Sequence, residues 1–158
     1  MTTELITNWT EHDDALRKLL LPLSKSLRIF DEDLTRLNLE RKEIAESFRH
    51  FLVANERNTL RIILRNPEPF QRNSPRLMKL LREYPKRMTV FECPQHLLSL
   101  GDNLLLVDDR HALVRFHKDN VRSKAIFDNA DECISYAHRF EEIAKEGGEQ
   151  ICATTLGL

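Results

Sequence analysis

Apolar and polar positions along this chain predict strands and helices in turn. Strand-like runs occur at residues 26–30, 60–64 and 88–92. Apolar residues at helical spacing predict helices over 10–20, 38–55, 75–84 and 129–146. Thr10, Ser74 and Asn129 are the predicted caps of the first, third and fourth of these helices. Because strands alternate with helices, we expect an α/β fold with a mostly parallel sheet and helices on both faces.

The stretch from Leu100 to Arg122 adds a hairpin after the third strand. The apolar run Leu104–Val107 turns at Asp108–Arg110 and returns over residues 111–117. A C-terminal hairpin strand pair should therefore complete the sheet. The chain has 158 residues, about the size of one ordinary domain.

We therefore expect one α/β domain over residues 26–146. An N-terminal helical segment over residues 1–25 would precede it, and a flexible or docking tail over residues 147–158 would follow.

Composition narrows the class of protein. Hydrophobic residues make up 41% and charged residues 31% of the chain, which is typical of a soluble globular protein. The formal net charge of −1 provides no overall attraction to nucleic acid or anionic membrane, so we expect nucleic acid to be an unlikely partner. There is no 18-residue apolar run and no signal-peptide core at the N-terminus, which favours a cytoplasmic protein without membrane association.

Cysteine and glycine usage argue against two further kinds of site. Cys93, Cys133 and Cys152 are odd in number and lack paired spacing, which argues against a disulfide framework or a structural zinc site. Three of the four glycines lie at or beyond Gly147, so a glycine-rich phosphate loop is absent. No cofactor is predicted.

The densest polar cluster lies in the hairpin. In a regular strand, His111, Leu113, Arg115 and His117 share one face, while Ala112, Val114 and Phe116 face the core. Two imidazoles and a guanidinium could bind a phosphate or carboxylate, and the alternative is a solvated hairpin edge. With Arg65, which follows the second strand, the candidate ligand-binding residues are Asp108, His111, Arg115, His117, Arg122 and Arg65.

Other polar groups have weaker interpretations. His111 and His117 lie about 20 Å apart along an extended strand, so we predict no metal site. Asp31–Asp33 and Arg65 follow neighbouring parallel strands, where either a ligand site or a loop salt bridge is expected. The basic residues from Arg72 to Arg87 could contact nucleic-acid phosphate, but a solvated helix face is favoured.

Together these elements resemble one half of a phospholipase D-like fold over Leu27–Lys145. The sequence more closely resembles an uncharacterised bacterial domain, found alone or fused to acetyltransferase-like domains in proteobacteria. The likeness is carried by Ile29–Asp31, Asp33, Leu34, Leu60–Ile62, Pro75–Met78, Leu80–Arg82, Asp108, His111, Arg115–His117 and Arg139–Ile143.

This resemblance implies the fold without the reaction. Phospholipase D-type chemistry needs a nucleophilic histidine, a lysine two residues later and an aspartate five residues after that. With Asp108 as that aspartate, the other two positions are Gly101 and Asn103. Glycine cannot attack phosphorus, and asparagine carries no positive charge.

Two hypotheses follow for function. The first is a noncatalytic binding or assembly module, expected to be a homodimer because such halves pair with a second half, with an anionic small molecule or a protein as partner. The second is a divergent enzyme acting on phosphate-containing substrates through His111 or His117.

Overall fold

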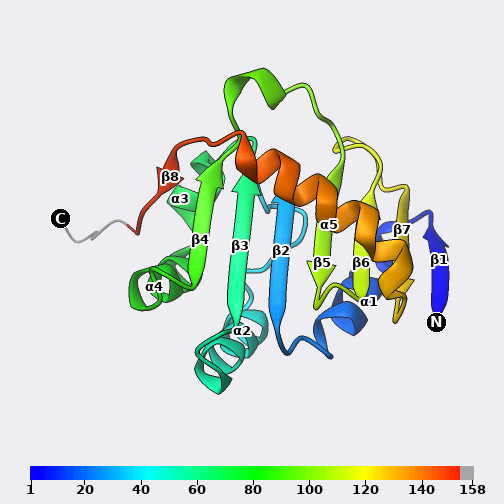
Figure 1. Ribbon diagram of the computed structural model, residues 1–158, viewed down its shortest axis with the longest axis horizontal. Helices are drawn as coiled ribbons and strands as arrows, with labels where there is room; N and C mark the ends of the chain where they lie inside the picture. Colours follow the sequence, from blue (N-terminus) through cyan, green and yellow to red (C-terminus); the bar gives the residue numbers. More distant parts are fainter. Residues whose placement is uncertain (154–158) are drawn as a thin grey trace.

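One mixed sheet organises the chain in the computed structural model, which describes residues 1–153 (Figure 1). The strands are β1 (Thr2–Ile6), β2 (Ser26–Asp31), β3 (Thr59–Leu64), β4 (Met88–Glu92), β5 (Asn103–Val107), β6 (His111–Arg115), β7 (Ser123–Phe127) and β8 (Gln150–Ile151). The helices are α1 (Trp9–Leu20), α2 (Lys42–Ala54), α3 (Glu68–Asn73), α4 (Pro75–Glu83) and α5 (Ala130–Lys145), with a 3₁₀ turn at Gln95–Leu97.

The α/β fold class is confirmed, but the expectation of a mostly parallel sheet is wrong. The strand order is β1-β7-β6-β5-β2-β3-β4-β8, and only the β2–β3 and β3–β4 pairs are parallel. The predicted hairpin β5–β6 joins the free side of β2 in antiparallel orientation, and β7 and β1 extend it. Helix α2, and α3 with α4, supply the crossovers between the parallel neighbours β2, β3 and β4.

Helices cover both faces of the sheet, as the sequence predicted. Helices α1, α2 and α4 lie behind the sheet in Figure 1, and α5 crosses its front diagonally. Phe48 and Phe70 are buried in the core on the first side, and Phe30 and Phe140 in the core on the second. Because β2, β3 and β5 are covered on both sides, they read as near-continuous apolar runs in the sequence.

The expected solvated edge at the hairpin is wrong, because β6 lies between β5 and β7 inside the sheet. Leu113 joins the core beneath α1, and Ala112 and Val114 join the core beneath α5. Arg115 is 5% exposed, whereas Phe116, predicted to face the core, is 44% exposed. Strand β6 ends at Arg115, so the predicted alternation does not extend to Phe116.

The chain ends take part in the same sheet. Residues 1–25, expected to be helical, contain strand β1 as well as helix α1, and β1 pairs with β7. In the predicted tail, Ile151 of β8 pairs with Val90 of β4, and residues 154–158 lie outside the described residues. Within residues 1–153, no helix combines the length and the hydropathy needed to cross a membrane.

Helix starts depend on contacts that are distant in sequence. Thr10 was the predicted cap of α1, but the Asn8 side chain accepts the backbone N–H of Glu11. Ser74 was the predicted cap of α4, yet its side chain makes no capping hydrogen bond. Instead, the Glu40 carboxylate accepts the first N–H groups of α4, from Arg76 (2.6 Å) and Leu77 (3.1 Å).

Candidate binding site at the carboxyl edge of the sheet

The carboxyl ends of the parallel strands collect the polar groups of this protein. Strand β5 is antiparallel to β2 and begins where β2 ends, and β6 returns to end beside the start of β5. The residues after β2 and β3, the start of β5 and the end of β6 therefore meet along one line, here named the carboxyl edge. In open α/β sheets this is where ligands bind.

Three buried polar side chains lie on neighbouring strands at this edge. Asp31, Asn103 and Arg115 are 2%, 4% and 5% exposed. The Asp31 carboxylate accepts the N–H of Leu34 (2.8 Å) and that of Asp33 (3.3 Å). Arg115 lies 4.0 Å from Asp31 and donates to the carbonyl of Lys118.

Burial disfavours the charges of both Asp31 and Arg115. It raises the pKa of the Asp31 carboxyl, although the Leu34 N–H and Arg115 oppose the change. Burial also lowers the pKa of Arg115; Asp31 acts against this, while Arg36 and Arg65 add to it. The mutual attraction of the pair thus does not compensate for its desolvation.

Arg65 ties the ends of three strands together. Its guanidinium donates to Glu32 (2.8 Å), to the carbonyl of Asp102 (2.8 Å) and to the side-chain oxygen of Asn103. It also lies 4.6 Å from the centre of the Phe30 ring. The Asn103 side-chain nitrogen, buried beside it, makes no hydrogen bond. The predicted loop salt bridge between the acidic residues after β2 and Arg65 is thus present.

A pocket of about 360 Å³ opens above Arg115. Its lining residues are Trp9, Glu32, Asp33, Thr35, Arg36, Arg115, Lys118 and Asp119. The guanidinium groups of Arg36 and Arg115 lie 3.4 Å and 5.5 Å from the centre of the Trp9 ring. Lys118 lies 3.6 Å from Glu32. The pocket thus combines the buried cation of Arg115 with two more exposed cations, Arg36 and Lys118, here named the outer cations, and the aromatic ring of Trp9.

The structure divides the predicted site residues between two ends of the sheet. Arg65, Arg115 and His117 lie at the carboxyl edge, and the carbonyl of Arg122 accepts the N–H of Phe116 just beyond β6. At the opposite end, the Asp108 carboxylate accepts the backbone N–H groups of Ser24, Lys25 and Ser26, at 2.7 to 3.2 Å.

His111 lies at that opposite end with Asp108, paired with Val107 across the hairpin. The length of β6 thus separates His111 from His117, as strand geometry predicted.

Both histidines have Nδ1 engaged. The backbone N–H of Asp128 donates to His111 Nδ1 (2.9 Å), and that of Asp119 donates to His117 Nδ1 (3.2 Å). A neutral ring that accepts at Nδ1 carries its proton on Nε2, so neither Nε2 has a free lone pair. The His117 ring also lies against Gly101, where an added Cβ would be 2.9 Å from Cδ2.

Sequence reasoning missed the outer part of the pocket. Trp9 comes from the start of α1 and Arg36 from the loop after β2, and nothing in the local pattern of either relates it to β6. The carboxyl-end rule did indicate the acidic loop and Arg65. In the described part of the chain, no group of His, Cys, Asp and Glu side chains is arranged to hold a metal ion.

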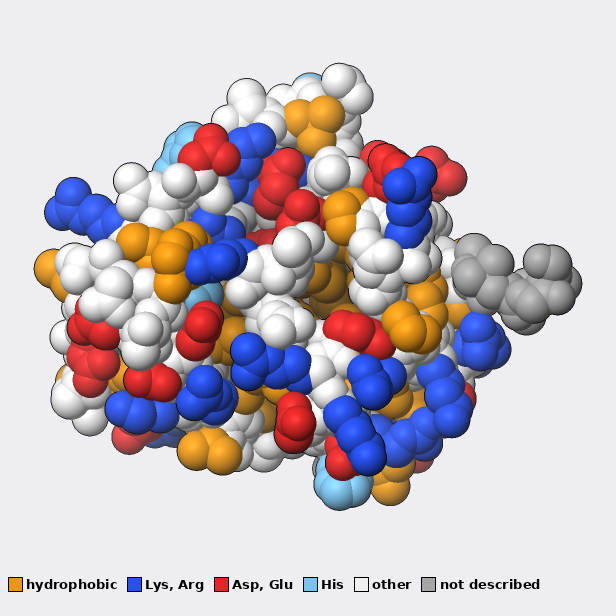
Figure 2. All heavy atoms as spheres, turned by 180° about the vertical axis from the view of Figure 1, so that it is seen from behind, with side chains coloured by type: hydrophobic (Ala, Val, Ile, Leu, Met, Phe, Trp, Pro, Cys, Tyr) orange, Lys and Arg blue, Asp and Glu red, His pale blue; other side chains and the backbone are white. Residues whose placement is uncertain are grey.

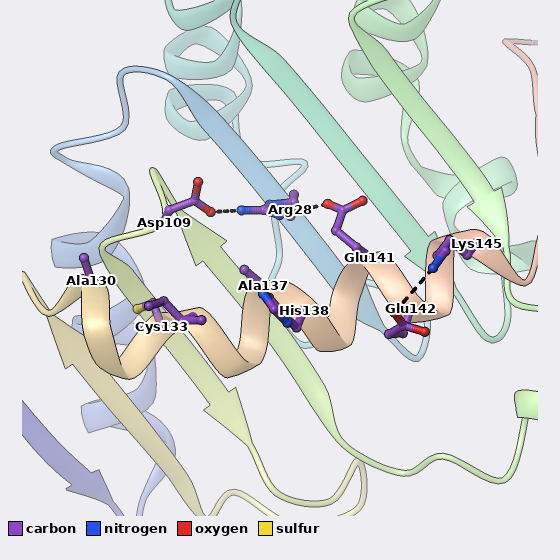
Figure 3. Close-up of a pocket in the computed structure, with 10 residues that line it drawn as sticks. Arg28, Asp109, Ala130, Cys133, Ala137, His138, Glu141, Glu142 and Lys145 are labelled. Atoms are coloured by element: carbon purple, nitrogen blue, oxygen red, sulfur yellow. Dashed lines mark hydrogen bonds and ion pairs between the residues drawn. The ribbon is translucent and has the colours of Figure 1, made fainter.

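A second, larger pocket of about 550 Å³ lies along α5 (Figure 3). Ala130, Cys133, Ile134 and Ala137 supply its apolar surface. On its polar side, Arg28 is paired with both Asp109 and Glu141, as Figure 3 shows. Burial raises the pKa of Cys133 to about 11, so its thiol stays protonated at neutral pH and is a poor nucleophile.

Solved structures share this fold at low sequence identity. The archaeal chromatin protein TrmBL2 matches with a TM-score of 0.69 and 9% identity over 94% of this chain. Nuc from Salmonella typhimurium, a phospholipase D family member, matches with a TM-score of 0.63 and 11% identity, over 96% of this chain and 99% of its own. NucT from Helicobacter pylori matches with a TM-score of 0.59 and 15% identity, over 94% of this chain and 98% of its own. The chain spans 54% of the TrmBL2 chain, and these matches establish the fold alone.

One expectation about partners needs correction. We expected nucleic acid to be an unlikely partner because the chain carries no net positive charge. The TrmBL2 structure, which has the same fold, is described as showing a novel mode of DNA binding. Net charge is a whole-chain sum and cannot exclude a local basic surface, so the expectation was wrong.

Sequence comparison places the chain in a family. No curated protein matches it. Residues 8–150, which include α1, the hairpin, α5 and every residue named at the carboxyl edge, match DUF7931, a domain of unknown function. The chain therefore belongs to the DUF7931 family, and its fold is similar to that of phospholipase D family members.

Proposed function

We propose that this chain is a noncatalytic binding domain whose carboxyl-edge pocket holds an anionic group against Arg115. The observation that carries the proposal is the environment of Arg115, a guanidinium that is 5% exposed yet lines an open pocket. Asp31 is ion-paired with Arg115 at 4.0 Å, and Asp33 is a second carboxylate that acts on its charge. A buried cation with so little compensation is stabilised by an anion that enters from the pocket.

The surrounding groups favour the same ligand chemistry. Arg36 and Lys118 add two outer cations, and Trp9 offers a flat wall. Three carboxylates also line the pocket, those of Glu32, Asp33 and Asp119. Glu32 is paired with both Arg65 and Lys118. A phosphate or carboxylate group fits donors of this kind, since a guanidinium can bind either one in a bidentate manner.

The absence of catalysis is inferred from what replaces the reacting groups. Gly101 and Asn103 stand where the related chemistry needs histidine and lysine, and Asn103 is held by Arg65. His117 lies over Gly101, but its Nδ1 accepts a backbone N–H. In that arrangement the unprotonated nitrogen, Nδ1, is engaged by a hydrogen bond and Nε2 carries the proton, so neither nitrogen is free to attack phosphorus or to remove a proton.

Binding can be measured through Trp9, the single tryptophan of the chain. We expect inorganic pyrophosphate to change Trp9 fluorescence in a saturable way at concentrations up to about 10 mM. The double variant Arg36→Gln/Lys118→Gln should weaken binding about tenfold, because it removes both outer cations. The matched double variant Arg110→Gln/Lys145→Gln removes the same charge far from the pocket and should bind like wild type. Equal weakening in both double variants, or no response in wild type, would contradict the proposal.

Catalysis is tested separately with bis(p-nitrophenyl) phosphate. Purified wild-type protein should release nitrophenol no faster than the His117→Ala variant, because His117 Nε2 carries a proton. Turnover that is present in wild type and lost in His117→Ala would instead establish the alternative, a divergent phosphate-acting enzyme that uses His117. His111→Ala is the matched control, since His111 has the same Nδ1 contact at the other end of β6.

A further inference from the structure

Basic side chains gather on helices α3 and α4, away from the carboxyl-edge pocket. Residues 68–87 carry six of the 24 Lys and Arg residues but only two of the 25 Asp and Glu residues. The rest of the chain is therefore acidic, with 18 basic and 23 acidic residues. Figure 2 shows Lys and Arg side chains concentrated over α2 and α4, at the lower right. The exposed members on and beside these helices, here named the α4 basic face, are Arg72, Arg76, Lys79, Arg82 and Lys86.

The packing of α4 turns this face outward. Leu77, Met78, Leu80 and Leu81 are all buried against the body of the protein. Arg76, Lys79 and Arg82 lie at exposed positions of α4 outside this apolar stripe. The orientation is set by the apolar stripe and does not depend on any ligand.

Few carboxylates neutralise the α4 basic face. Glu68 pairs with Arg72 (2.8 Å), and Glu40 lies 4.0 Å from Arg76. Glu83 pairs with Arg49 of α2 (2.6 Å), and Arg49, Lys79 and Arg82 together lower the pKa of Glu83. Among residues 1–153, no ion pair involves Lys79 or Lys86. The face therefore keeps an excess of positive charge even though the whole chain is slightly acidic.

The arrangement fits an extended polyanion better than a small ligand. The basic positions follow one another along two consecutive helices and do not converge on one point. Arg76 and Arg82 alone are about 9 Å apart along the α4 axis. Phosphates of a nucleic-acid strand recur about every 3.4 Å along the duplex axis, so the face can contact several of them.

The face also lacks the groups that other anionic partners need. Attachment to a membrane needs exposed apolar side chains beside the charges, but the large apolar residues of α4 are buried. Single strands are held by base stacking on aromatic rings. The nearby Tyr84 is half-buried, and the Arg87 guanidinium lies 5.0 Å from its ring centre. We propose that the α4 basic face binds the phosphate backbone of double-stranded nucleic acid without sequence preference.

The test is fluorescence anisotropy with a labelled mixed-sequence DNA duplex of about 20 base pairs. Wild-type affinity should fall steeply between about 50 and about 200 mM salt, because binding releases counterions. The triple variant Arg72→Gln/Lys79→Gln/Lys86→Gln should bind at least about tenfold more weakly. Its slope of log affinity against log salt should be smaller by about 2.7, which corresponds to three lost phosphate contacts. All three side chains are exposed, so its unfolding temperature should match wild type.

A matched triple variant separates this surface from general charge. Arg17→Gln/Lys18→Gln/Lys25→Gln removes the same charge from exposed residues in and near α1 and should bind DNA like wild type. Equal losses in the two triple variants, or no wild-type binding at low salt, would overturn the proposal. So would binding to vesicles of phosphatidylcholine and phosphatidylserine without binding to the duplex. Neither result bears on the Arg115 pocket, which the pyrophosphate titration tests independently.

Discussion

Replacing Arg65 with methionine is expected to lower the free energy of unfolding by about 3 kcal/mol, because the change breaks a buried ionic network by removing its cation. Methionine keeps an aliphatic side chain beside Phe30, so the change in stability reports the contribution of the guanidinium alone. Glu32 would then keep Lys118 as its partner, and the Asn103 side chain would lose the hydrogen bond to its oxygen. Urea unfolding followed by circular dichroism measures the change.

The control for this variant is Arg110→Met. Arg110 also pairs with an aspartate, Asp128, but the two side chains are 57% and 55% exposed. Solvent screens an exposed pair of this kind, so the unfolding midpoint should stay at the wild-type value. If Arg65→Met were as stable as Arg110→Met, the network at the carboxyl edge would not stabilise the fold.

Replacing Asp108 with alanine is expected to lower the free energy of unfolding by about 3 kcal/mol, through two effects that add. The carboxylate binds three successive backbone N–H groups, at Ser24, Lys25 and Ser26, and holds the loop that enters β2. Asp108 also has a φ of 54°, in the left-handed region that alanine tolerates poorly. Urea unfolding again measures the loss.

Two further variants separate these contributions. Asp109→Ala shares the backbone cost, since Asp109 has a φ of 57°, and it also removes the ion pair with Arg28, which keeps Glu141 as a partner. Because it leaves the Asp108 contacts in place, it should lose less stability than Asp108→Ala. Asp108→Asn keeps a residue suited to the left-handed region and should lie between wild type and Asp108→Ala. If Asp108→Ala and Asp109→Ala were equally destabilised, the loop contacts would contribute no more than the ion pair between Asp109 and Arg28.

These two residues, of which only Arg65 lies at the candidate site, show what the sequence could and could not predict. Arg65 was identified because it follows a strand, and the ends of neighbouring parallel strands meet. Asp108 was identified from its place at a turn in a polar cluster, but its environment was not predictable. The contacts of Asp108 run to Ser24, Lys25 and Ser26, which are over 80 residues away along the chain. No local sequence pattern can predict contacts between residues so far apart along the chain.

The local sequence pattern was sufficient to predict a helix or strand where burial is uniform along that element. The predicted strand 88–92 coincides with β4, and the predicted hairpin with β5 and β6, because apolar runs report burial directly. The cap at Asn129 was also correct, since its side chain accepts the N–H of Glu132 three residues later. A cap of this kind depends only on neighbours in sequence.

Pairing between segments that are distant in sequence decided the remaining features of the fold and of the site. Four of the five residues of β1 are polar or exposed at the sheet margin, and β1 is a strand because β7 lies beside it. The sheet is mixed because the hairpin joined β2 in the antiparallel direction, which alternation of strands and helices does not specify. The pocket over Arg115 likewise needs Trp9 and Arg36, which only the folded chain places beside β6.

By itself, the sequence determined which segments are buried, because the free energy of burying apolar surface depends on side chains that can be read one by one. It also predicts that phospholipase D-type chemistry is absent, because Gly101 and Asn103 supply neither a nucleophile nor a cation, and this stays a prediction. Only the tertiary structure decided which charges meet. The distances between Asp31, Asn103 and Arg115 are set by the register of β2 against the hairpin β5–β6, which lies far from β2 in the sequence.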